Sequence, residues 1–71
     1  MNLVEIETFL AIAELGSLVK ASRRLNVTAS AVTSRVHSLE EQIGEPLFYR
    51  NKSGATLTSE GFRFQRYAEA M

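Results

Sequence analysis

The sequence predicts a mainly helical domain in which three helices are followed by a small β-hairpin and the start of a fourth helix. Apolar residues recur at three- and four-residue steps in several segments, a pattern typical of amphipathic helices. Nearer the C-terminal end, two short runs with strand composition flank a turn that contains glycine. With 71 residues, the chain is long enough for one domain with a small core.

The first two helices are delimited by residues that favour helix ends. The first is predicted over residues 3–15, and Gly16 stands where a C-terminal cap belongs. The second is predicted to begin after Ser17, whose hydroxyl can accept from a free amide of the first turn, and to run to Leu25. Asn26 follows, and asparagine tolerates the left-handed conformation that ends a helix.

The third helix is predicted from Thr28, as its N-cap, to Ile43, because Gly44 and Pro46 prevent its continuation. One side of this helix is apolar and consists of Val32, Val36, Leu39 and Ile43. The opposite side carries Ser30, Ser34, His37, Ser38 and Glu41. A face of short hydroxyls is unusual, because a merely solvated helix face favours Glu and Lys.

A hairpin is predicted from strands at residues 47–50 and 55–58, joined by a four-residue turn at residues 51–54. A two-stranded ribbon is marginal in water, so we expect Phe48 and Leu57 to lean on the helices.

The fourth helix is predicted to begin at Thr58 or Ser59, with Glu60 near the positive end of the helix dipole. Its apolar residues at helical spacing are Phe64, Tyr67, Ala68 and Met71. Because this stripe continues beyond an apparently complete core, we interpret it as a dimer seam. The competing interpretation is that it simply covers the core.

Charge is unevenly distributed although the net charge is zero. Residues 16–37 contain four basic side chains and no acid, and residues 47–58 contain two basic side chains and no acid. If both segments fold to one face, that face attracts phosphate. Taken alone, the charge pattern favours the simpler interpretation that these segments are solvated helix faces.

The composition argues against several function classes. The chain has no Cys, no Asp and a single His, so we expect no metal, no cofactor and no enzymatic activity. No apolar run is long enough to cross a membrane. The absence of cysteine fits a cytoplasmic location.

The segments on either side of Asn26 favour a helix-turn-helix over about residues 17–38. Ala21 offers a small side chain where the two helices would cross, and Val27 can plug the turn. The second helix of such a motif enters the major groove of DNA, and a following hairpin with a basic tip forms a wing. The alternative is a plain three-helix bundle.

Several motifs stand in a fixed order: residues 9–18, residues 20–28, residues 30–33, residues 39–44, residues 47–50, Leu57-Thr58 and Gly61. Together they resemble the N-terminal module of the LysR-type transcriptional regulators over essentially the whole chain. The resemblance implies a winged helix-turn-helix DNA-binding domain in residues 1–58 and the start of a linker helix in residues 59–71. It further implies a homodimer formed through that helix, and a small-molecule effector bound only by a C-terminal domain absent from these residues.

The function expected from these features is sequence-specific binding of double-stranded DNA by a bacterial transcriptional regulator. The predicted base contacts are Ala29, Ser30, Thr33, Ser34 and His37. The predicted phosphate contacts are Arg23, Arg24, Thr28, Arg35, Arg50 and Lys52. Of the adjacent Arg23 and Arg24, we expect one to bind phosphate and the other to pair with a glutamate. The alternative function is a winged-helix module that binds protein.

Three positions depart from the pattern of the family. The family commonly has Gln where this chain has Ala29, Arg or Lys where it has Ser34, and Gln where it has Arg35. These residues lie on or beside the expected groove-facing side, so the usual operator of the family is not assumed.

Overall fold

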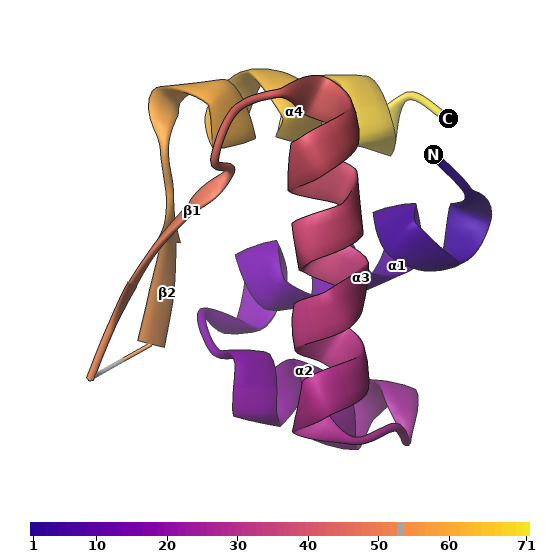
Figure 1. The fold of residues 1–71 in the computed structure, drawn as a ribbon, viewed down its shortest axis with the longest axis vertical. Coiled ribbons are helices and arrows are strands. Elements are labelled where there is room, and N and C mark those ends of the chain that lie inside the picture. The colour runs from indigo at the N-terminus through magenta and orange to yellow at the C-terminus, as the bar shows by residue number, and fades with distance from the viewer. Residues whose placement is uncertain (53) are drawn as a thin grey trace.

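Three helices, a β-hairpin and a fourth helix follow one another along the chain (Figure 1). The computed structural model describes residues 1–52 and 54–71. The elements are α1 (Leu3–Leu15), α2 (Leu18–Leu25), α3 (Ala29–Ile43), β1 (Phe48–Asn51), β2 (Gly54–Leu57) and α4 (Ser59–Glu69). The order and the mainly helical class are those that the sequence predicts. Ser53, which belongs to the predicted turn, lies outside the described residues.

Each helix begins at a side chain that accepts a hydrogen bond from its first turn. The caps are Asn2, Ser17, Thr28 and Thr58, which accept from the amides of Glu5, Lys20, Ala31 and Gly61 at 2.8–3.1 Å. At the other end, Gly16, Asn26 and Gly44 adopt left-handed backbone conformations and close α1, α2 and α3. Local chemistry therefore fixes the helix boundaries, and the predicted caps are confirmed.

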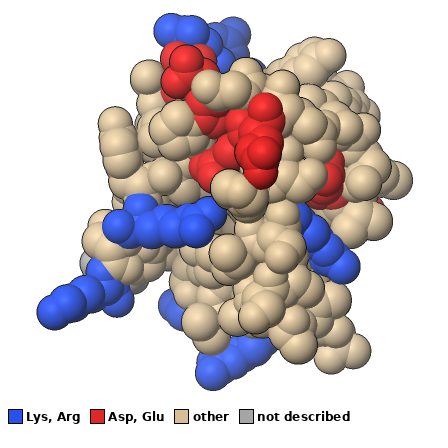
Figure 2. Space-filling view, viewed as in Figure 1, with Lys and Arg blue, Asp and Glu red and all other residues tan. Residues whose placement is uncertain are grey.

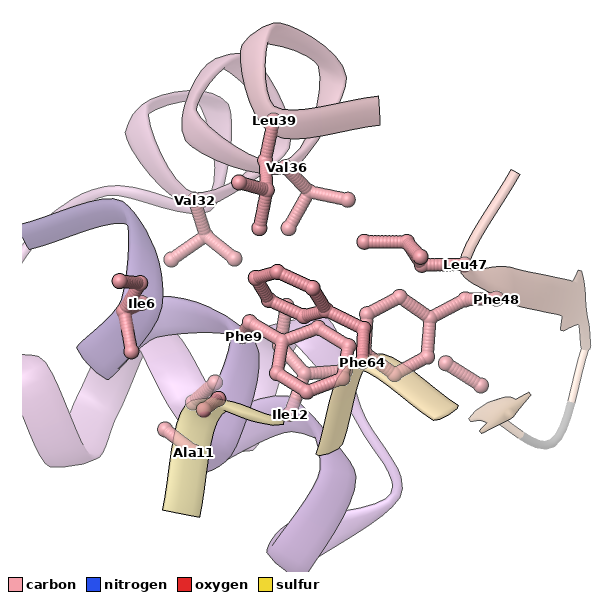
Figure 3. Packing of buried hydrophobic residues seen from close by; sticks show 13 residues of the cluster. Ile6, Phe9, Ala11, Ile12, Val32, Val36, Leu39, Leu47, Phe48 and Phe64 are labelled. Carbon is pink, nitrogen blue, oxygen red and sulfur yellow. The ribbon is translucent and has the colours of Figure 1, made fainter. Parts of the chain in front are cut away.

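The core is built around the ring of Phe9 (Figure 3). Phe64 of α4 meets this ring edge-on, with ring centroids 4.9 Å apart, and Phe48 of β1 lies at 5.2 Å. From α3, the buried side chains of Val32, Val36 and Leu39 point toward the same centre. The predicted apolar stripe of the third helix is thus confirmed at these three positions, while Ile43 is only partly buried.

The hairpin is shifted by one residue relative to the prediction. Phe48 pairs with Leu57, and Asn51 pairs with Gly54. Both strands therefore lie one residue nearer the tip of the hairpin than the predicted strands at residues 47–50 and 55–58. Leu47 precedes β1 and is fully buried. The predicted strand start is wrong because the amide of Leu47 donates to the Glu40 carboxylate on α3 instead.

The hairpin is attached by its backbone to the turn between α1 and α2. The amide of Ala55 donates to the carbonyl of Gly16 at 2.9 Å. A Cβ on Gly54 would lie 2.1 Å from that carbonyl oxygen, and the φ of Gly54 is +144°. Only glycine fits both the conformation and the space, so the hairpin is held close to this turn.

Helix α4 crosses one end of the molecule and completes the core (Figure 1). Phe64 and Ala68 are buried, whereas Tyr67 and Met71 are 61% exposed. The expectation that the core is complete before this helix is wrong, because the Phe9 ring requires Phe64 as a neighbour. The predicted stripe is therefore divided, and two of its four side chains are already covered within the protomer.

Candidate nucleic-acid interface

Helices α2 and α3 form a tight helix-turn-helix. Ala21 is fully buried where the two helices pack together. Asn26 has a φ of +58°, and the amide of Val27 donates to the carbonyl of Ser22 at 3.0 Å. Val27 itself packs against the core and fills the turn. The predicted roles of these turn residues are confirmed, and the turn directs the first half of α3 to the surface.

The first half of α3 presents a polar and uncharged surface. All five residues predicted to contact bases are exposed: Ala29, Ser30, Thr33, Ser34 and His37. Their side chains are short, apart from the histidine, and no carboxylate occurs on α3 before Glu40. Such a surface can come close to the floor of a groove without repelling phosphate.

Basic side chains surround this uncharged surface on three sides, and acidic side chains lie beyond it. In Figure 2, which has the orientation of Figure 1, the area over the N-terminal half of α3 is tan and basic side chains lie to its left, to its right and below it. Acidic side chains gather over the C-terminal half, where the sequence has Glu40 and Glu41, and Glu45 follows just after the helix. The uncharged part of the helix is thus framed by cations, and its far end is acidic.

The two adjacent arginines of α2 differ in their surroundings. Arg24 Nη1 donates to Glu14 Oε2 of α1 at 2.9 Å. Arg23 is exposed and forms no ion pair with any residue that the structure describes. The prediction that one of the two pairs with a glutamate is confirmed, and Arg23 is the one whose charge is available.

Arg35 leaves the exposed face of α3 and turns toward α1. It is partly buried, and its Nη1 donates to Thr8 Oγ1 at 3.4 Å. Thr8 is fully buried, and its own hydroxyl donates to the carbonyl of Val4 at 2.8 Å. The guanidinium therefore lies on the flank of α3, with its position biased by a fixed hydroxyl.

Arg50 lies beside α3 instead of extending freely from the hairpin. Its Nη2 is 3.8 Å from Oε1 of Glu40, while Oε2 of the same carboxylate accepts from the amide of Leu47 at 2.7 Å. Lys52, near the tip, is exposed. Sequence reasoning missed Glu40, because nothing in its local pattern indicates that it meets the start of the hairpin.

Two further polar contacts lie along α3. His37 Nε2 is 2.7 Å from Glu41 Oε1, and both side chains are largely exposed. Thr28 is exposed and uses its hydroxyl to accept from the amide of Ala31 at 3.1 Å. Its predicted phosphate contact would therefore be made at a helix start whose first amides point outward.

A polar cluster that the sequence did not reveal connects the start of α1 with the end of α3. Gln42 Nε2 donates to both carboxylate oxygens of Glu5, at 3.3 and 3.5 Å, and to Ser38 Oγ at 3.1 Å. Hydrogen bonds from Ser38, from the Asn2 backbone and from Gln42 lower the pKa of Glu5, although burial acts in the opposite direction. The cluster favours an ionised Glu5 and steadies α3 behind its exposed face.

Within residues 1–52 and 54–71, no three His, Cys, Asp or Glu side chains are grouped so that they could hold a metal ion. No helix in this part of the chain is long and apolar enough to cross a membrane.

Residues 3–62 match the model of the bacterial regulatory helix-turn-helix proteins of the lysR family. The chain belongs to this family. The LysR resemblance inferred from the sequence motifs is thereby confirmed. The matched residues include the helix-turn-helix and the hairpin described above.

Similar LysR-family proteins include transcriptional regulators and solved structures. The chain is 42% identical over 67 residues to the transcriptional regulator CzcR of Bacillus anthracis, and 42% identical over 65 residues to the transcriptional regulator YofA of Bacillus subtilis (strain 168). These alignments cover 94% and 92% of the chain, but the chain spans only 23% of the length of either curated relative. Its fold is similar to that of CbnR_DBD in a crystal structure of a complex with DNA, with a TM-score of 0.96 and 31% identity over 99% of this chain and 80% of that one.

Proposed function

We propose that this chain binds double-stranded DNA in a sequence-specific manner, as the N-terminal part of a bacterial transcriptional regulator. The observation that carries this proposal is the exposed face of the first half of α3, which has no charged side chain and is framed by basic side chains. In the proposed complex, α3 enters the major groove, and the hairpin rests on the backbone or in the adjacent minor groove. The similarity to CbnR_DBD, whose structure includes DNA, supports this arrangement.

Base recognition in this proposal comes from the short side chains of α3. The hydroxyls of Ser30, Thr33 and Ser34 can donate to and accept from base edges, and the methyl of Ala29 can contact the methyl of thymine. His37, one turn further along, reaches the edge of the same surface. Because hydroxyls are short, the backbone of α3 must approach the bases closely, and the exposed face described above permits this.

Phosphate binding in this proposal comes from residues around α3. Arg23 and Lys52 are exposed and form no ion pair with a described residue, so they can bind phosphate without losing a partner. Arg24 and Arg50 must first exchange Glu14 and Glu40 for phosphate. Arg35 and the first amides of α3 after Thr28 complete the proposed contacts.

We further propose that two copies bind together and that residues 59–71 begin the helix that joins them, after a DNA-binding domain at residues 1–58. In α4 and the residues after it, the exposed large apolar side chains are Phe62, Tyr67 and Met71. A dimer would place two copies of α3 in major grooves one helical turn apart, about 34 Å. The chain spans only 23% of the length of CzcR, and we place the small-molecule effector that the LysR resemblance implies in a further domain outside these residues. A DNA target supports a cytoplasmic location.

The experiment that tests this function is selection of bound sequences from a pool of random duplexes, followed by binding measurements on the enriched sequence. We expect enrichment of two related half-sites about one helical turn apart, and tighter binding to the enriched duplex than to the same bases in scrambled order. Equal binding to both duplexes would contradict sequence-specific recognition. Absence of binding to either, at low salt, would contradict DNA binding altogether.

A further inference from the structure

The contact between His37 and Glu41 lies on the face of α3 that is proposed to meet DNA. At about 100° per residue, Ser30, Ser34, His37 and Glu41 fall within about 60° of one another around the helix axis. Ser34, His37 and Glu41 also line one shallow hollow on the surface, together with Ser38 and Gln42. The histidine and the glutamate are 70% and 68% exposed, so neither is needed to fill the core.

The hydrogen bond determines which nitrogen of the ring carries the proton. Nε2 of His37 lies 2.7 Å from Oε1 of Glu41, a distance typical of a charge-assisted hydrogen bond. A carboxylate can only accept, so Nε2 must be the donor. In the neutral ring, Nδ1 is then an acceptor, and it has no hydrogen-bond partner among the residues that the structure describes.

We propose that Glu41 is a positioning residue that orients His37, and that the pair selects a base with an amino group at one position of each half-site. This inference rests on the proposed function, because it requires α3 in the major groove. In that groove, adenine N6 and cytosine N4 present donors, whereas guanine O6 and thymine O4 present acceptors. An accepting Nδ1 therefore favours adenine or cytosine over guanine or thymine on the strand that it faces.

A preference for bases with an amino group, adenine and cytosine, over bases with a keto group, guanine and thymine, distinguishes this contact from other base contacts. We refer to it as the amino-over-keto preference. Replacing an A·T pair by C·G keeps an amino group on the contacted strand, so binding should be retained. Replacing the same A·T pair by T·A, or C·G by G·C, moves the amino group to the other strand, so binding should weaken about three- to tenfold, the size of one hydrogen bond. A preference for guanine would instead indicate a donor at Nδ1 and would overturn the proposal.

The role of Glu41 is tested by two substitutions that differ in what they remove. E41A removes the acceptor, and we expect it to abolish the amino-over-keto preference as H37A does. E41Q removes the charge but keeps an oxygen that can accept from Nε2, so it should retain most of the preference. The matched control is E45Q, which removes a charge from a second hollow that His37 and Glu41 also line, and which should leave the preference intact.

The binding assay uses the duplex enriched from the random pool and its single-pair variants, at fixed salt and at pH 8. In the H37A background, E41A should have no further effect on base preference, because a positioning residue acts only through the residue that it positions. Equal effects of E41A with and without His37, or equal effects of E41A and E45Q, would overturn the proposal. If the unchanged chain does not discriminate the enriched duplex from its scrambled form, the proposed function fails; if it discriminates but the His37 and Glu41 variants keep its preferences, this inference alone fails.

Discussion

The carboxylate of Glu40, in the last turns of α3, accepts a hydrogen bond from the backbone amide of Leu47 at 2.7 Å, just before the hairpin begins. The side chain of Glu40 is only 16% exposed, and Leu47 is fully buried. The second carboxylate oxygen lies 3.8 Å from Arg50 of β1. One side chain therefore connects the proposed recognition helix to the base of the hairpin.

The first prediction is that E40A destabilises the domain and loosens the hairpin. Removing the acceptor leaves the Leu47 amide without its partner in a largely buried place, which costs about 1–3 kcal/mol. Urea unfolding followed by circular dichroism measures the change in the free energy of unfolding. E45A is the matched control, because Glu45 is exposed and makes no ion pair with a described residue; equal stability of E40A and E45A would contradict the prediction.

The second prediction concerns Arg50. If roughly three of the five proposed cationic side chains of each protomer neutralise a phosphate, a bound dimer should show a slope of about −5 for log K against log salt. R50A removes one contact per protomer, so the slope should become shallower by about 2, and binding to all sequences should weaken alike. S34A provides the comparison, because loss of a base contact should change the preference among sequences instead. The division of roles would be refuted by two variants that reduce specific and random binding in the same proportion.

The third prediction is that Glu5 makes folding stability depend on pH. Hydrogen bonds from Ser38, Asn2 and Gln42 lower its pKa in the folded state below the ordinary value of 4.5. The stabilisation from Glu5 is therefore fully present above that value and is lost as the pH falls through the folded-state pKa. Unfolding free energies of the unchanged chain and of E5Q, measured from neutral to acidic pH, should differ most near neutrality and converge in acid. A difference that grows toward acidic pH would show that the sign is wrong.

The fourth prediction separates the two sides of α4. F64A removes the ring that packs on Phe9 and should cost about 3–5 kcal/mol, which is most of the stability of a small domain. Y67A removes a largely exposed ring, so the domain should stay folded while self-association weakens. Thermal unfolding and sedimentation equilibrium measure the two effects. Unchanged self-association of Y67A would contradict the proposed dimer surface on this side of α4.

The parts of the fold that the sequence predicts are those fixed by short-range chemistry. The hydroxyl of Thr28 accepts from the amide of Ala31, and the amide of the left-handed Asn26 donates to the carbonyl of Arg23. Each partner is only three residues away, so local sequence suffices. Periodicity also identifies an apolar face on α4, but it does not say whether Phe64 is covered by its own chain or by another one. The partners of Glu40 and Arg35 depend on segments brought together only by folding, and no local pattern indicates them.

The close approach of Gly54 to the carbonyl of Gly16 has a consequence for how such a domain can diversify. Main-chain atoms hold the hairpin there to the turn that leads into α2, the first helix of the helix-turn-helix, through the hydrogen bond from Ala55 to Gly16. Surface substitutions can therefore alter which bases or phosphates are contacted without altering the distance between the hairpin and the helix-turn-helix. The hairpin and α3 therefore keep a fixed separation while the side chains on their surfaces can be exchanged.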